Sequence, residues 1–280
     1  MATRLTSGLS ALTGMSMAAL LWAQAALADR AAQFDALMDA LRMTDTVAIM
    51  HDEGVQYGAT LIQDMMMDAD TPGWRLRVGL IYDEARMYDL LTSGLEAELA
   101  QTDLDPLVAF FTSELGAEII ALELAAREAF FDEEVEMAAR DRFEDLTDND
   151  DPLIAQITTM MEDSDLVEFN VMGIMNANLM LYRGLADGGA IDLGEEDILR
   201  DVWTQEGSVR SESTGWIQGY FLTAYGALPE QDLEAYAAFW RTDEGRAFNA
   251  ALFAVFDQMY EELSYLLGRA TAEQLQSEEL

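Results

Sequence analysis

The sequence predicts an all-α protein, a multi-helix bundle built from two related helical units. Apolar residues recur at helical spacing in one segment after another, and strand-like alternation of Val, Ile and Thr is scarce. Only four prolines interrupt the 280 residues. One stretch of the chain also returns later, which is typical of a repeated helical unit. Together these observations favour helices packed on helices.

The repeated stretch covers residues 104–116 and returns over residues 233–245. In both copies a short amphipathic helix ends in two aromatic residues, and a hydroxyl residue and a glycine follow. The six corner residues are Phe110, Ser113, Gly116, Phe239, Thr242 and Gly245. The hydroxyl stands where it can cap the next helix, and the glycine costs about 1 kcal/mol of helix propensity against alanine. We therefore expect a tight corner where two backbones approach too closely for a Cβ, built for packing and not for a ligand.

The corner and the long amphipathic helix after it resemble the bacterial "domain of unknown function 2059" family. The likeness covers about 40 residues around Gly116 and, more loosely, a second stretch around Gly245. Members of this family are typically small exported helical proteins without an assigned reaction. The resemblance therefore implies a helical fold and export, and it carries over no catalytic residue.

Residues 1–28 predict an export signal. Arg4 is their only charged residue, an apolar stretch follows it, and Ala26-Leu27-Ala28 forms a small-x-small cleavage pattern. We expect cleavage near Ala28 and a periplasmic location. The alternative is an uncleaved anchor, which needs about 20 apolar residues, but serine, threonine and glutamine dilute this stretch. No later stretch predicts a membrane span, so none is expected after removal of the signal.

The remainder of the chain predicts two units and a tail. Residues 29–147 form the first unit, with its corner at Gly116, and residues 148–271 form the second, with its corner at Gly245. Residues 272–280 are expected to be a frayed tail. In the first unit, helices are expected over residues 31–43, 45–67, 74–99 and 116–146. In the second unit, they are expected over residues 154–161, 166–185, 195–203 and 211–227.

Two ion pairs are predicted within the helix over residues 116–146. Glu123 with Arg127, and Glu136 with Arg140, have the i,i+4 spacing at which opposite charges stabilise a helix.

The charge balance limits the classes of partner. The chain carries 15 basic residues, all of them arginine, against 53 acidic ones, and its formal net charge is −38. Such a surface repels nucleic acid and anionic lipid. It suits an unknown protein partner, a cationic partner, or solubility in saline surroundings. There is no cysteine, so an exported chain would have to be stabilised without disulfides.

Motifs that carry chemistry are scarce. His51 is the only histidine, and its helical neighbours offer no further metal ligands. Paired carboxylates are everywhere in so acidic a chain, and the 17 methionines stand in apolar segments where methionine fills helical cores. We predict no catalytic residue, no metal site and no cofactor.

The sequence thus favours an exported binding or interaction module that is not an enzyme. Two alternatives remain open. One is a carboxylate-dependent enzyme with a cleft between the two units. The other is a methionine-rich Cu(I)-binding protein, since thioethers are soft copper ligands.

Overall fold

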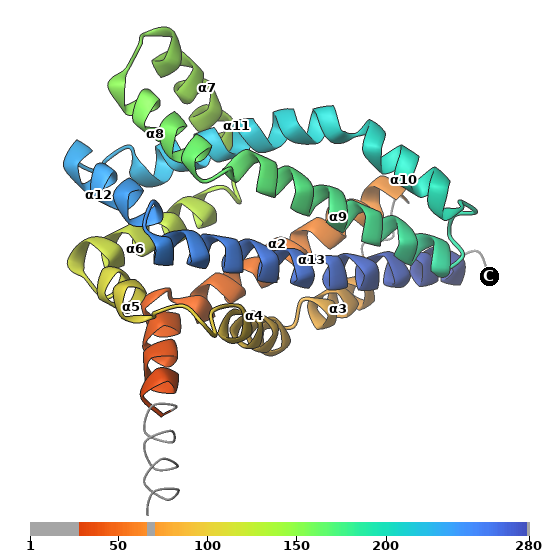
Figure 1. Ribbon diagram of the computed structural model, residues 1–280. Helices are drawn as coiled ribbons and strands as arrows, with labels where there is room; N and C mark the ends of the chain where they lie inside the picture. Colours follow the sequence, from red (N-terminus) through yellow and green to blue (C-terminus); the bar gives the residue numbers. More distant parts are fainter. Residues whose placement is uncertain (1–27, 66–70, 279–280) are drawn as a thin grey trace, which may run out of the picture.

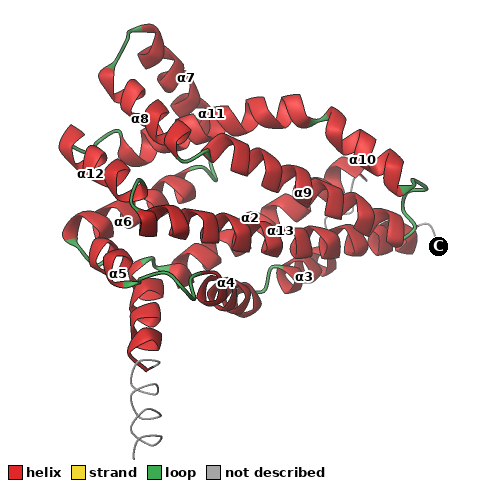
Figure 2. Ribbon diagram, viewed as in Figure 1, coloured by secondary structure: helices red, strands yellow, loops and turns green. Residues whose placement is uncertain are grey.

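A computed structural model describes residues 28–65 and 71–278. Within these ranges every regular element is a helix and no strand occurs (Figure 2). The all-α prediction is therefore confirmed. The predicted signal lies outside the described residues, except for Ala28.

The chain folds into a series of helices joined by short turns (Figure 1). A helix over residues 28–40 comes first. The labelled helices that follow are α2 (Met43–Met65), α3 (Pro72–Ile81), α4 (Glu84–Glu98), α5 (Asp105–Phe111), α6 (Glu114–Ala129), α7 (Glu133–Asp148), α8 (Pro152–Asp163), α9 (Leu166–Asp187), α10 (Glu195–Thr204), α11 (Glu206–Tyr225), α12 (Glu230–Trp240) and α13 (Asp243–Glu278).

The interior is continuous across the predicted boundary between the two units. One cluster of buried apolar side chains extends from Phe34 to Ala272. The boundary itself falls at the end of α7, directly before the turn to α8. In that turn Asp151 caps α8 by accepting a hydrogen bond of 3.0 Å from the Leu153 amide. The two stretches of sequence therefore share one core.

α13, with 36 residues, crosses the whole molecule (Figure 1). It lies along α9 and also packs against α3 and α4. The predicted frayed tail is wrong as far as residue 278, because α13 continues to Glu278. Ala272 is fully buried, and the Gln276 side chain donates a 2.7 Å hydrogen bond to the carbonyl oxygen of Gly188 at the end of α9. Contact with α9 thus keeps these residues helical.

The predicted helix over residues 116–146 is two helices, so this expectation is also wrong. α6 ends at Ala129 and α7 begins at Glu133. Asp132 caps α7 by accepting a hydrogen bond of 2.9 Å from the Glu134 amide. Between the helices, the buried Phe130 ring meets Trp216 of α11 edge-on at 5.7 Å. A capping aspartate and a ring that must reach the core together end the first helix.

Both predicted corners are helix–turn–helix junctions with the same capping hydrogen bonds. Ser113 accepts a hydrogen bond of 3.0 Å from the Gly116 amide at the start of α6. Thr242 accepts one of 2.9 Å from the Gly245 amide at the start of α13. Each hydroxyl therefore satisfies an amide that the first turn of a helix leaves unpaired.

The glycines stand where the backbone leaves no room. A Cβ on Gly116 would lie 2.1 Å from the Phe110 carbonyl oxygen, and one on Gly245 would lie 2.2 Å from that of Phe239. The rings of Phe110 and Phe239 also stack on each other, with 4.0 Å between their centroids. The two corners thus pack together, whereas the wider internal repeat stays a prediction.

Candidate functional site

The site is built on the long parallel pair of helices α9 and α13. Toward their C-terminal ends the two backbones touch at Gly184 and Gly268, which we call the glycine contact. A Cβ on Gly268 would lie 2.2 Å from the Leu181 carbonyl oxygen, and one on Gly184 would lie 2.3 Å from that of Tyr265. Toward their N-terminal ends the helices diverge (Figure 1). The pair therefore forms a wedge that is closed at one end.

A cavity of about 940 Å³ lies at the open end of this wedge. We call it the cleft. Side chains of α2, α6, α11 and α12 line it together with those of α9 and α13. Its walls are mainly aromatic and aliphatic, and include Tyr82, Trp216, Phe221, Trp240, Phe253 and Phe256. The volume falls in the range of roughly 300–1,000 Å³ that is common for small-molecule sites.

The cleft reaches the protein surface through apolar side chains. Tyr57 of α2 and Phe169, Met172 and Ile174 of α9 line the cleft and are also exposed to solvent. Phe169 stacks on Phe253 of α13 with 4.5 Å between ring centroids, so an aromatic pair joins the diverging helices at this end. Apolar surface that is both concave and exposed is typical of a binding site.

Glu123 of α6 is the acidic centre of the cleft. The phenol groups of Tyr225 and Tyr236 both donate hydrogen bonds of 2.6 Å to its Oε1. Tyr220 donates a further bond of 3.1 Å to the Glu123 carbonyl oxygen. We call these four residues the tyrosine–glutamate cluster. Burial raises the pKa of the Glu123 carboxyl above its ordinary value, although the two phenol hydrogen bonds act in the opposite direction.

The predicted ion pair between Glu123 and Arg127 is wrong. Arg127 instead uses Nε and one terminal nitrogen to donate hydrogen bonds of 2.6 Å to the two carboxylate oxygens of Glu53 in α2. This two-pronged geometry is stronger and more specific than a helical i,i+4 pair. The second predicted pair, Glu136 with Arg140, is confirmed.

A second polar group bridges the wedge. Asn176 of α9 donates a hydrogen bond of 3.1 Å to an oxygen of Asp257 in α13, and both residues line the cleft. Along each of the two helices, the residue that forms this bridge lies between the glycine contact and the Phe169–Phe253 pair. The carboxylate of Asp257, like that of Glu53, is therefore held by a protein partner.

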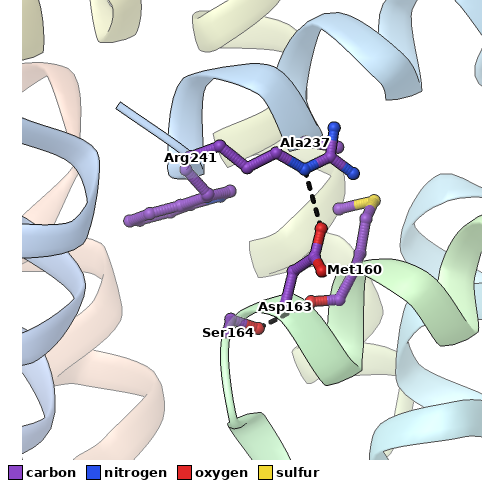
Figure 3. A pocket seen from close by; sticks show the side chains of 6 residues that line it. Met160, Asp163, Ser164, Ala237 and Arg241 are labelled. Atoms are coloured by element: carbon purple, nitrogen blue, oxygen red, sulfur yellow. Dashed lines mark hydrogen bonds and ion pairs between the residues drawn. The ribbon is translucent and has the colours of Figure 1, made fainter. Parts of the chain in front are cut away.

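A small pocket adjoins the cleft at α8 and α12, and Met160, Ser164 and Trp240 line both spaces. Figure 3 shows Arg241, which follows α12, donating from Nε to the Asp163 carboxylate of α8 at 2.7 Å. This solvent-exposed ion pair ties α12 to α8 beside the cleft.

The six corner residues predicted from the sequence do not line the cleft. They lie behind it, since the Phe110 ring stacks on that of Tyr236, with 5.9 Å between centroids. The corners thus support helices α6 and α12, which supply Glu123 and Tyr236. Sequence reasoning raised a cleft between the two units only for the enzyme alternative and assigned no lining residue to it. The sequence does hold one indication of the site. Ile119, Ile120 and Ala126 share the helical face of Glu123, so a carboxylate lies on an otherwise apolar face of this helix.

His51 and two of the methionines at the cleft have surroundings that the structure describes. The His51 Nδ1 lies 2.7 Å from the carbonyl oxygen of Tyr82. Within the described ranges, no group of three or more His, Cys, Asp or Glu side chains is placed to hold a metal ion. Met50 and Met160 line the cleft but are buried among core residues.

Residues 85–145 match the model of the family described as "Uncharacterized protein conserved in bacteria (DUF2059)". The matched stretch includes the first corner, Glu123 and Arg127, so the resemblance seen at Gly116 is confirmed, whereas the match does not extend to Gly245. No curated protein and no solved structure matches the chain. Among the residues that the structure describes, no helix is long and apolar enough to cross a membrane.

Proposed function

We propose that the protein is an exported binding protein that holds an elongated, mainly apolar small molecule in the cleft. The observation that carries this proposal is the cavity of about 940 Å³ whose walls are mainly aromatic and aliphatic. Sites for small molecules commonly combine apolar walls with a few polar groups that orient the ligand.

The energetics favour an apolar occupant. Transfer of apolar ligand surface out of water gains about 25 cal/mol per Å². Tyr57, Phe169 and Met172 also expose apolar surface at the mouth of the cleft, and a ligand would cover part of it. The polar groups at Glu53 and Asp257 already have protein partners. An apolar ligand along these walls would therefore leave both of these carboxylates with their hydrogen bonds.

The proposed location is the periplasm. It rests on the export signal predicted over residues 1–28 and on the small-x-small pattern that ends at Ala28. A cleft for apolar molecules suits a carrier in an aqueous compartment between membranes, where such molecules need shielding from water.

Titration with an uncharged apolar dye, N-phenyl-1-naphthylamine, tests the proposal. We expect saturable binding with one site per chain, together with a change in the fluorescence of Trp216 and Trp240, which line the cleft. Ala177→Phe places a ring in the cleft and should weaken binding about tenfold, the equivalent of ~1.4 kcal/mol. Ala138→Phe, at an exposed site on α7, is the matched control and should bind as the parent does. Equal affinity in all three proteins, or no saturable binding, would refute the proposal.

An enzyme is a second candidate, because Glu123 is a carboxyl that lines the cleft and has a pKa raised by burial. A carboxyl whose pKa is raised in this way can serve as a general acid. Incubating the parent and Glu123→Gln with a periplasmic extract, followed by mass spectrometry, separates the two functions. Depletion of one compound by many equivalents, seen only with the parent, favours the enzyme. Retention of one equivalent favours the carrier.

A further inference from the structure

The charges that line the cleft around Glu123 do not balance. Arg127 contributes one positive charge and Glu53 one negative charge, and these two groups bind each other through two hydrogen bonds. Within the described part of the chain, Glu123 forms no ion pair and receives its side-chain hydrogen bonds from two neutral phenols, both at Oε1. When Glu123 is ionised, this group of residues therefore carries one uncompensated negative charge. A buried charge is costly unless a counter-charge is present.

Aromatic rings surround this carboxyl. Tyr225 and Tyr236 hold it, Trp216 stacks on Tyr220 with 5.0 Å between ring centroids, and Trp240 meets Tyr236 edge-on at 5.7 Å. The faces of such rings attract cations, and aromatic cages are a common way to recognise ammonium groups. Carboxylate and rings together favour a positive ligand group and oppose a negative one.

From this arrangement we propose that the molecule bound in the cleft is an amphipathic cation, with an amine or quaternary ammonium head at Glu123 and an apolar tail between α9 and α13. This inference rests on the proposed binding function and specifies its ligand class. The formal net charge of −38 acts in the same direction, because it raises the concentration of cations near the protein surface.

Cation binding should also be coupled to the release of a proton. Burial raises the pKa of Glu123, so the carboxyl of the empty cleft holds its proton to higher pH than an exposed glutamate does. A cationic head favours the ionised carboxylate and displaces that proton. Arginine stays charged, and burial raises the pKa of the surrounding tyrosines, so those keep their protons. The titratable and charged groups around Glu123 are Tyr220 and Tyr225 of α11, Tyr236 of α12, Arg127 of α6, Glu53 of α2 and Tyr260 of α13.

Two probes with the same tail test the ligand class: dodecyltrimethylammonium and dodecanol, both below the concentrations at which they aggregate. We expect the cation to bind the parent at least tenfold more tightly than the alcohol does. Glu123→Gln should lose this preference and still bind dodecanol. Glu128→Gln removes the same charge from an exposed site on α6 and should retain the preference, which controls for attraction to the acidic surface.

Calorimetry of the unmodified protein gives a second measurement that needs no variant. Titration of the cation in two buffers with different heats of ionisation should reveal a released proton, and the affinity should rise with pH below the pKa of Glu123. An equal preference in Glu123→Gln and the parent, or an affinity for the cation that does not change from pH 4 to pH 8, would overturn the proposal of a cationic head. If neither probe binds, the proposed binding function fails as well. Binding of both probes with equal affinity would refute only the positive charge proposed for the head of the ligand.

Discussion

The two ends of the α9–α13 pair differ in how closely the two helices approach each other. At the glycine contact, Gly184 and Gly268 bring the backbones so close that neither residue has room for a Cβ. At the other end, large rings such as Phe169 and Phe253 stand between the helices. One end thus maximises backbone contact, and the other keeps the helices apart and encloses a cavity.

The difference shows how a helical protein can hold a cavity without collapsing. Cores pack to high density unless something rigid keeps their elements apart. Here the closed end fixes the angle of the wedge, and the hydrogen-bonded groups of the open end, Glu123 with its tyrosines and Arg127 with Glu53, hold the far helices in place. Stability and binding therefore reside at different ends, and variants can separate them.

Loss of the glycine contact should have the largest effect. Gly268→Leu forces a side chain into the space of the Leu181 carbonyl oxygen and drives α9 and α13 apart. We expect a loss of about 3 kcal/mol or more in the free energy of unfolding. Thermal and urea unfolding followed by circular dichroism measure it.

Gly207 supplies the matched control. It lies in helix α11, and a Cβ on it would meet nothing within 4 Å. Gly207→Leu should leave stability unchanged or raise it by ~0.5–1 kcal/mol, because leucine has the higher helix propensity. Equal unfolding curves for Gly268→Leu and Gly207→Leu would show that the closed end is not held by backbone contact.

The corners support the open end of the wedge. Replacing their glycines should lower the free energy of unfolding somewhat less than Gly268→Leu does. Gly116→Leu or Gly245→Leu places a Cβ against a carbonyl oxygen of its own corner, a clash that a local shift of one turn can partly relieve. We expect each variant to lose ~2 kcal/mol of unfolding free energy. Melting temperatures compared with Gly207→Leu measure the loss, and parental values would contradict the close-approach explanation.

Of these substitutions, Glu123→Gln should have the smallest effect on the free energy of unfolding at neutral pH. The size of this effect should depend on pH. Its pKa is raised in the folded state, so its stabilising contribution is present below the pKa of the unfolded chain and is lost as pH rises toward the folded pKa. Relative to Glu123→Gln, the parent should thus lose up to ~1.4 kcal/mol per pH unit across that window. Urea unfolding of both proteins from pH 4 to pH 8 measures this difference. A difference that does not change with pH would rule out a raised pKa.

Local features of the fold could be predicted from the sequence, and the cleft could not. Helical periodicity and the Ser113 cap depend on neighbours within a turn or two, so the sequence pattern reveals them directly. Glu123 and Arg127 also look like local partners, but their real partners come from α2, α11 and α12. Partners so distant in the chain are known only once the helices are packed.

The same reasoning explains two smaller errors. The break between α6 and α7 depends on Phe130 reaching Trp216 of α11, which no local pattern reports. The helical structure of residues 272–278 depends on contact with α9, through the hydrogen bond from the Gln276 side chain to the Gly188 carbonyl oxygen. In both places a contact distant in the sequence decided a local structure.

The position of α13 after the helices that it covers bears on how the protein is made. This helix packs against α3, α4 and α9, and Arg77 pairs with Glu273, which lies 196 positions later in the sequence, at 3.1 Å. A polypeptide that emerges in N-to-C order therefore has uncovered apolar faces on its earlier helices until α13 has been made. Sealing of the interior therefore waits until α13 has been synthesised and has packed against these earlier helices.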